Sequence, residues 1–260
     1  MFLNCSLLCR QSLNHAQIYI LESITMSRWQ AAGIHFSASM LIFLVLLTVI
    51  MQVWYPGILF SIDGGWSGLS LVLGVDLVVG PFLTLIVFKA GKPGLKFDLS
   101  CIAVFQAACM IAGMSIVYNE RPLALVFAYD TLYSVAAQEF ENFEKDPAFL
   151  DSFPGPYPKL VYVELPESEF AASIANMRSQ FIGDPLYIQT ENYRAMPNGY
   201  SEVAAIFRVE EAGRSSASDE ILNRLDESCL FSKFVSSVTS GFVCFDADDV
   251  EISKFFESEG

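Results

Sequence analysis

The acid that stands out in this sequence is Asp76, because it lies inside an apolar stretch long enough to cross most of a bilayer. The segment "LVLGVDLVVGPFLTLIVF" (71–88) carries Asp76 near its middle and Pro81 five residues later. A charged group at the bilayer centre costs about 2.5–3.5 kcal/mol on insertion scales, so such groups usually face a helix bundle or a partner and mark function. Pro81 would remove the backbone hydrogen bond to the Leu77 carbonyl and kink the helix beside the acid.

Two interpretations of Asp76 stay open. In the first, the acid is protonated or hydrogen-bonded inside the bundle and holds the helices in register. In the second, Asp76 and the Pro81 kink form a polar notch in which a second transmembrane helix docks.

Depth in the membrane ranks the internal partners that Asp76 could have. Asp76 lies 12 residues, or about 18 Å, from the cytoplasmic end of its span. Thr48 lies 11 residues, or about 16 Å, up the first span, so it is the first choice. Gln52 lies about one turn further out. Gln106 is seven residues, or about 10 Å, into the third span and reaches less well.

The elements that must position these residues are three apolar runs. A membrane span needs about 20 mostly apolar residues. Three runs fit, and the second carries one charge: 37–55, 66–88 and 99–118. Three buried helices of a water-soluble protein are the alternative, but successive runs joined by loops of about ten residues favour a membrane domain over 26–119.

Basic residues set the orientation, because cytoplasmic loops are enriched in Lys and Arg. Arg28 precedes the first span, and the loop "KAGKPGLK" (89–96) carries three lysines. The loop "PGILFSIDGG" (56–65) carries no Lys or Arg. We therefore expect a cytoplasmic N-terminus and an outer domain formed by 120–260, which in a bacterium means an inner-membrane protein with a periplasmic domain.

Charge divides the chain at the same boundary. Residues 1–119 hold five basic and four acidic residues, whereas residues 120–260 hold 10 basic and 25 acidic ones. The front is near neutral and the back is strongly acidic. An acidic domain argues against nucleic-acid binding, which needs clustered Lys and Arg.

The first 25 residues fit poorly with the rest. They lack the basic start, long apolar core and small-residue cleavage site of a signal peptide. Met26 opens "MSRWQAAGIHF", a short basic leader suited to the first span. We therefore interpret 1–25 as a doubtful extension and Met26 as the expected start.

The outer domain is predicted to be a small α+β domain. Runs rich in β-branched and aromatic residues predict strands, and apolar residues at helical spacing predict helices. The predicted strands are 123–129, 159–165 and 241–245; the predicted helices are 167–180 and 218–237. The fold class is therefore three transmembrane α-helices followed by a small α+β soluble domain.

Six cysteines are distributed over all parts of the chain. Cys5 and Cys9 lie in the extension, and Cys101 and Cys109 are interpreted as small apolar fillers of the third span. Cys229 and Cys244 lie in the outer domain, where an oxidising compartment favours a disulfide, although two free thiols remain the alternative. A Cys229–Cys244 disulfide would close a loop of about 15 residues and stabilise the fold by roughly 3 kcal/mol.

Catalytic chemistry has little support. Both histidines, His15 and His35, precede the first span, so the outer domain cannot form a Ser–His or Cys–His pair. The acidic stretch "FDADDVE" (245–251) lacks the Gly and distal Glu of an EF-hand loop. We predict no enzyme activity, no metal and no cofactor.

Five motifs occur in an order that is similar to a known family. They are "GIHF" (33–36), "WYPG" (54–57), "GVDLVVGPFLTLIVF" (74–88), "LKFDL" (95–99) and "ERPLALVFAYD" (120–130). Together they resemble the type IV pilin accessory proteins of the TfpX/TfpZ family, over about 26–130. The resemblance makes candidates of the motif residues Lys96, Asp98, Arg121, Pro122 and Asp130.

The resemblance implies an inner-membrane accessory factor for type IV pilus biogenesis, which binds or chaperones the pilin subunit before or during assembly. Twitching motility and DNA uptake depend on such pili. The implied partners are a pilin subunit, other pilus assembly proteins and the membrane. Under this interpretation, Asp76 and Pro81 are the intramembrane contact for pilin.

Three other functions stay open. One is a membrane-anchored sensor, although its cytoplasmic parts are too short for a kinase or cyclase. Another is a pilin-modifying membrane enzyme, which lacks a recognisable nucleophile pair. The third is a transporter, for which three spans are few.

Overall fold

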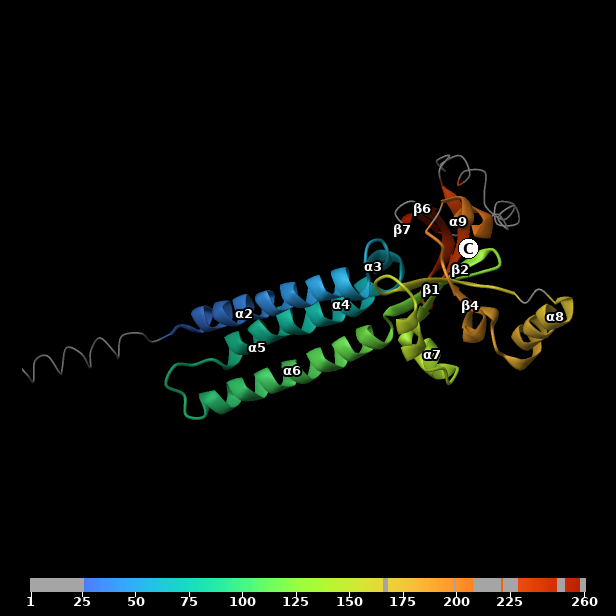
Figure 1. The fold of residues 1–260 in the computed structure, drawn as a ribbon. Helices are drawn as coiled ribbons and strands as arrows, with labels where there is room; N and C mark the ends of the chain where they lie inside the picture. Colours follow the sequence, from blue (N-terminus) through green and yellow to red (C-terminus); the bar gives the residue numbers. More distant parts are fainter. Residues whose placement is uncertain are drawn as a thin grey trace, which may run out of the picture. The chain divides into compact units, whose positions relative to one another are not determined.

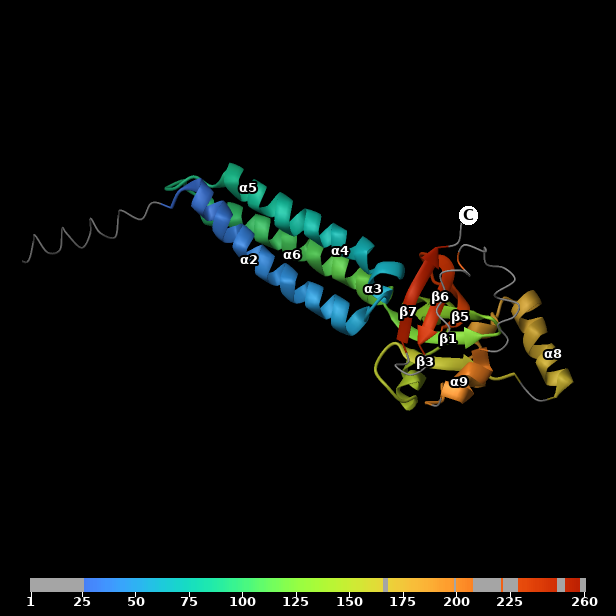
Figure 2. The ribbon, with the colours of Figure 1, turned by 90° about the horizontal axis from the view of Figure 1, so that it is seen from above.

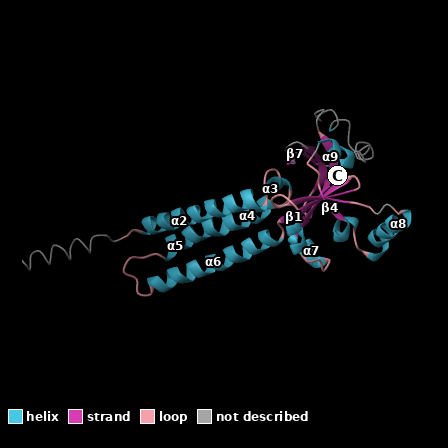
Figure 3. Ribbon diagram, viewed as in Figure 1, coloured by secondary structure: helices cyan, strands magenta, loops and turns pink. Residues whose placement is uncertain are grey.

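The computed structural model describes residues 26–165, 168–198, 200–207, 221, 229–246 and 251–257. The chain divides into two compact units. The helical unit reaches to Phe43 and includes Val72–Ile111, and the sheet unit comprises Leu44–Leu71 and Ala112–Gly260. All described strands belong to the sheet unit (Figure 3). The predicted extension 1–25 lies outside the described residues.

Two helices are long and apolar enough to cross a membrane, by length and composition alone. The first is α2 (Arg28–Val49), which continues as a π-helical segment, Ile50–Trp54. The second is α6 (Leu95–Asn119). Both contain the predicted apolar runs 37–55 and 99–118 almost entirely, and both begin earlier than the hydropathy pattern suggests. α2, α5 (Gly80–Val87) and α6 run lengthwise beside one another in Figures 1 and 2.

The early start of α2 has a local cause. The Ser27 hydroxyl accepts the Gln30 backbone N–H at 3.2 Å, and the Gln30 side chain accepts the Ser27 N–H at 2.9 Å. This reciprocal pair is a capping box, which satisfies amide groups that a helix start leaves unpaired. The helix therefore begins at Arg28, and His35, which the sequence pattern places before the first span, lies within α2.

The second predicted span, 66–88, is helical but not uniform. It consists of α4 (Gly65–Leu73), a π-helical segment (Gly74–Val79) and α5. Its apolar part Gly74–Val87 is shorter than the other two candidates. The third span therefore stays a prediction.

The sheet unit is built on a mixed sheet with the strand order β4-β3-β1-β2-β5-β6-β7. β1 pairs in parallel with β3, and β2 pairs in parallel with β5, whereas the other neighbours are antiparallel. The strands are β1 (Pro122–Ala128), β2 (Thr131–Ala136), β3 (Lys159–Val163), β4 (Tyr193–Ala195), β5 (Leu230–Val235), β6 (Ser240–Asp246) and β7 (Glu251–Glu257).

Both faces of this sheet are covered, so β1 is buried along its whole length and reads as a continuous apolar run. One face packs with α3 (Leu59–Ile62) and α9 (Tyr200–Phe207), through Leu59, Ile62 and Val203. The other face packs with α7 (Ala137–Asn142) and two 3-10 helices, Pro147–Ser152 and Leu186–Ile188. The predicted loop 56–65 is thus part of the core of the sheet unit.

The strand and helix predictions for the outer domain are correct in part. The predicted strands correspond to β1, β3 and β6, and helix 167–180 corresponds to α8 (Glu169–Met177) and its π-helical extension Arg178–Ile182. The predicted helix 218–237 is wrong for its final part, because residues 230–235 form β5. Pairing of β5 with β6 on one side and β2 on the other overrides the helical spacing.

Candidate functional site

Asp76 lies in the π-helical segment Gly74–Val79 of the helical unit. The Gly80 N–H donates to the Val75 carbonyl, five residues earlier. In this register the next residue, Pro81, would donate to the Asp76 carbonyl, but proline has no N–H. The Asp76 carbonyl therefore lacks a backbone donor in this register, and a π turn directly precedes Pro81, where the sequence predicts a kink. Single π turns inside α-helices occur frequently at functional sites.

The side chain of Gln106 compensates for the missing donor. Its Nε2 donates to the Asp76 backbone oxygen in a long hydrogen bond of 3.5 Å, and Gln106 is buried. Gly80 makes room for it, because a Cβ at Gly80 would lie 1.9 Å from the Gln106 Nε2 atom. Gly80, Pro81 and Gln106 thus together surround the backbone of Asp76.

A cavity of about 210 Å³ lies beside Asp76 and Gln106. Its polar lining residues are Asp76, His35, Ser39 and Gln106; its apolar lining residues are Ala38, Ile42, Ala103, Ala107 and Met110. The His35 Nδ1 atom hydrogen-bonds the Thr84 hydroxyl at 2.6 Å, which fixes the ring. Asp76 is 8% exposed, and among the described residues its Oδ1 atom has no hydrogen-bond partner.

The candidate partner that the structure brings to Asp76 differs from the first choice by depth, and its contact is with the backbone oxygen of Asp76 rather than with the carboxylate. Gln106, the third choice, contacts Asp76, whereas the Thr48 hydroxyl donates to the Leu44 carbonyl of its own helix at 2.8 Å. Gln52 lines a different cavity, in the sheet unit. The ranking counted residues from the ends of apolar runs, but the helices begin earlier and the π turn changes the rise per residue. His35, Thr84 and Gly80 were missed, although the adjacent pair Gly80–Pro81 was a visible signal.

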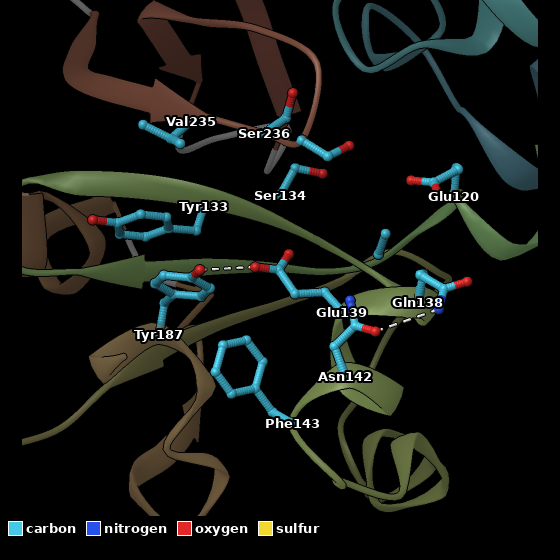
Figure 4. A pocket seen from close by; sticks show the side chains of 12 residues that line it. Glu120, Tyr133, Ser134, Gln138, Glu139, Asn142, Phe143, Tyr187, Val235 and Ser236 are labelled. Carbon is cyan, nitrogen blue, oxygen red and sulfur yellow. Dashed lines mark hydrogen bonds between the residues drawn. The ribbon is translucent and has the colours of Figure 1, made fainter. Parts of the chain in front are cut away.

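The sheet unit has its own pocket, with a volume of about 460 Å³ (Figure 4). Tyr133 and Tyr187 stack there with ring centroids 4.3 Å apart, and the Tyr187 hydroxyl donates to Glu139 Oε1 at 2.8 Å. Glu120 also lines the pocket, and none of its described lining residues is basic. Burial raises the pKa of Glu139, the Tyr187 hydrogen bond lowers it, and the charge of Glu120 raises it further; the net shift is upward.

Asp63 supports this pocket from the segment between α3 and α4. It is 5% exposed, and its carboxylate accepts a hydrogen bond from the Ser134 hydroxyl, while Ser236 supplies a second one. Both serines line the pocket. Burial raises the pKa of Asp63 to about 6, against the two serine hydrogen bonds, and the charges of Glu120 and Glu139 add to the rise.

The groups that line the pocket are suited to recognition. Hydroxyl groups, carboxylates and an aromatic face can bind a donor or a cationic group. The described lining includes no His, Cys or Lys that would activate a nucleophile. Within the described part of the chain, no three His, Cys, Asp or Glu side chains are placed to hold a metal ion. Of the stretch 245–251 that we considered for calcium, residues 247–250 lie outside the described residues.

The cysteines of the outer domain lie together. Cys229 and Cys244 are joined as a disulfide with their Cα atoms 5.3 Å apart, within the range that disulfides require. They pack with Phe231, Phe242 and Phe256 at the β5–β6 side of the sheet. In α6, Cys101 is exposed, so it does not fill the interior of the helical unit, whereas Cys109 is half-buried.

Two residues of the family-like motifs, Arg121 and Asp130, make contacts on either side of β1. The Arg121 guanidinium lies 3.4 Å from the centroid of the Tyr118 ring, a cation–π contact. Asp130, in the turn between β1 and β2, accepts from Lys233 Nζ at 2.9 Å and from the Thr131 hydroxyl at 3.0 Å. Burial alone would raise the pKa of Asp130, but Lys233 and Thr131 hold it below its usual range.

The other motif residues lie at the start of a strand or a helix. Pro122 is the first residue of β1. Lys96 and Asp98 lie in the first turn of α6, and Asp98 accepts from Lys92 Nζ at 2.6 Å. An acid in a first turn is favourable beside the positive end of the helix dipole. Pro122 and Asp98 thus have structural positions at the start of β1 and of α6.

Comparison with known proteins finds relatives among bacterial assembly proteins. The chain is 36% identical over 104 residues to "Fimbrial assembly protein, serogroups C1 and C2" of Dichelobacter nodosus, which covers 39% of this chain and 79% of that protein. It is 38% identical to the serogroup E1 protein and 36% identical to the serogroup I protein of the same organism, again over 104 residues. The aligned part spans 40% of the length of each of these two longer relatives. No protein family model and no solved structure matches the chain.

Proposed function

The chain belongs to the family of the Dichelobacter nodosus fimbrial assembly proteins, and we propose that it is an inner-membrane accessory factor of type IV pilus biogenesis. In this role it binds or chaperones the pilin subunit before or during assembly. The similarity to the serogroup C1 and C2 protein, over 79% of that protein, carries the proposal.

The two units suit this role in different ways. α2 and α6 are able to cross a membrane by length and composition, which supports an anchor in the membrane. The sheet unit offers the pocket of about 460 Å³ that Glu120 and Glu139 line. Its hydroxyl groups, carboxylates and stacked tyrosines can bind the surface of another protein. The acidic balance of residues 120–260 steers a basic surface toward it and affects the association rate more than the affinity.

Deletion of the gene in its native bacterium, followed by counting of pili, tests the proposal. We expect few or no pili and loss of twitching, with restoration by the intact gene. Co-purification of the pilin from crosslinked membranes tests the contact itself. Normal piliation in the deletion strain would overturn the assembly role, and absence of pilin from every crosslinked preparation would overturn the pilin partner.

The orientation is tested separately by fusions to alkaline phosphatase, which is active only in the periplasm. A fusion after residue 94 should be inactive and a fusion after residue 125 active, because we place 89–96 in the cytoplasm and the sheet unit in the periplasm. The opposite pattern of activities would reverse the topology.

A further inference from the structure

The most distinctive group of the helical unit is the Asp76 carboxylate. It is nearly fully buried, it faces a cavity of about 210 Å³, and its Oδ1 atom has no hydrogen-bond partner among the described residues. Buried polar atoms are almost always hydrogen-bonded, so each exception requires an explanation. A missing donor from outside the chain is the explanation that we develop here.

The polar neighbours whose contacts are known are engaged elsewhere. The Gln106 amide donates to the Asp76 backbone oxygen, and the His35 Nδ1 atom contacts Thr84. The surrounding structure holds the backbone of Asp76, since Gly80 leaves room for Gln106 and Pro81 leaves the Asp76 carbonyl free for it. The described neighbours of Asp76 therefore leave its Oδ1 atom without a hydrogen-bond donor.

The lining of the cavity indicates what kind of group could enter. Ala38 on α2 and both Ala103 and Ala107 on α6 are small and exposed, and Ile42 is 47% exposed. Small side chains at a helix surface allow another helix to approach closely. One carboxylate with one serine hydroxyl and one glutamine amide does not supply the six or more oxygen ligands of a hard cation. At about 30 Å³ for each water-sized group, the cavity of about 210 Å³ has room for roughly seven such groups, enough for the polar end of one side chain.

We propose that this cavity is the acceptor site for one hydrogen-bond-donating group, a hydroxyl, amide or amine, carried on a transmembrane helix of the pilin subunit. The donor reaches Asp76 Oδ1 between Ala38 and the alanines of α6, and the partner helix packs across their exposed faces. This inference rests on the proposed function for the identity of the partner. The acceptor and the shape of its surroundings come from the chain itself.

Site-specific photocrosslinking in membranes that contain the full chain and its pilin tests the inference. p-Benzoylphenylalanine replaces Ile42, at the cavity, or Leu41, the next residue of α2, which is 66% exposed and does not line the cavity. We expect pilin to crosslink from position 42 at least five times more strongly than from position 41. Equal crosslinking from both positions would overturn the site.

Two substitutions examine the acceptor in the same assay. Asp76→Leu should lower crosslinking from position 42 at least fivefold at equal protein level, because it removes both acceptor oxygens. Asp76→Asn keeps one acceptor oxygen: retained crosslinking supports a hydroxyl or amide donor, and loss equal to that of Asp76→Leu supports an amine. Unchanged crosslinking in Asp76→Leu would overturn the proposal.

A second pair of variants leaves Asp76 in place, in case its substitution lowers the protein level. Ala107→Phe fills the mouth of the cavity and should also reduce crosslinking at least fivefold, whereas Ala108→Phe, at an exposed position that does not line the cavity, should not. Equal effects of the two would contradict the site. If pilin co-purifies but never crosslinks from position 42, this inference fails while the proposed function stands; if pilin does not associate at all, the proposed function fails.

Discussion

Two buried acids, one in each unit, show how differently this chain uses the same side chain. Asp63 of the sheet unit is 5% exposed and Asp76 of the helical unit is 8% exposed. Asp63 accepts hydrogen bonds from two serines, whereas Asp76 Oδ1 has no partner among the described residues. A satisfied buried acid contributes to specifying the fold; an unsatisfied one is costly and is retained where a binding partner completes it.

Sequence context indicates burial for Asp76 but not for Asp63, although both are buried. Asp63 lies in "IDGG", which looks like an exposed turn, and Asp76 lies in an apolar run where any acid is conspicuous. The turn is buried because α3 packs on the sheet and Gly65 lies against Phe60, whose carbonyl would be 2.8 Å from a Cβ at Gly65.

The largest expected effect separates function from stability at Asp76. Asp76→Leu removes a buried acceptor that has no donor, so the isolated protein should be at least as stable as the wild type in detergent. Piliation should nevertheless fall at least tenfold, because the partner's donor loses its acceptor. Thermal unfolding in detergent and pilus counts on the same strains measure the two effects.

Val78→Leu is the matched control, since Val78 is two residues away and 62% exposed. It should change neither quantity. If Asp76→Leu lowers the protein level together with piliation, Asp76 is a structural residue and the difference between the two acids disappears.

Sequence patterns predicted the helical unit better than the sheet unit, and the reason is physical. An apolar run of membrane length forms a helix from its own composition, so α2 and α6 were found with errors only at their ends. Strands depend on their neighbours. β5 has apolar residues at positions 230, 231, 234 and 235, a spacing that also fits a helix, and only its pairing with β2 and β6 decides the matter. β2 was missed because the tight turn before it contains no Gly or Pro, and Tyr129 adopts a φ of 56° there.

The candidate site shows the same limit. Asp76, Pro81 and Gln106 were conspicuous as polar or helix-breaking residues in apolar runs. Their arrangement was not predictable, because it depends on a π turn that shifts hydrogen bonding by one residue. His35 was placed before the span, since hydropathy does not detect the Ser27–Gln30 capping box that starts α2.

The next largest effect concerns the disulfide, which belongs to the sheet unit alone. Cys229 and Cys244 close a loop of 15 residues, so its removal should destabilise the sheet unit by roughly 3 kcal/mol. Cys229→Ser combined with Cys244→Ser should lower the unfolding temperature of the sheet unit under oxidising conditions and abolish its dependence on reductant. Thiol labelling of the unreduced protein at both cysteines would show that the bond is absent. Cys101→Ser is the control and should change neither result.

The pH dependence of stability distinguishes Asp63 from ordinary surface acids. The folded protein holds the proton of Asp63 up to a pH of about 6, whereas the ordinary pKa is 3.8. Between these values the folded state binds more protons than the unfolded state, so stability falls as the pH rises, by about 3 kcal/mol at most. Asp63→Asn keeps an acceptor for Ser134 and cannot ionise. It should therefore be more stable than the wild type at pH 8, and the difference should shrink toward pH 4.

Thermal unfolding of the full chain in detergent at several pH values measures this difference. A constant difference between wild type and Asp63→Asn across the range would show that Asp63 is not responsible. Asp151→Asn, an exposed carboxylate of the same unit, is the control.

The smallest effect concerns Asp130, and its sign is opposite to that of Asp63. Lys233 and Thr131 lower the pKa of Asp130, so its contribution to stability is present above the ordinary pKa of about 4 and is lost as the pH falls. The Lys233–Asp130 ion pair is partly exposed, with 34% and 24% of the two side chains accessible, and such pairs contribute about 1 kcal/mol. Asp130→Asn should therefore cost about that much at pH 7 and little at pH 3. A double-mutant cycle with Lys233→Gln isolates the ion pair. If Asp130→Asn instead abolishes piliation with stability unchanged, Asp130 contacts a partner. In that case an acid of this protein can have a binding role even though its hydrogen bonds are made within the chain.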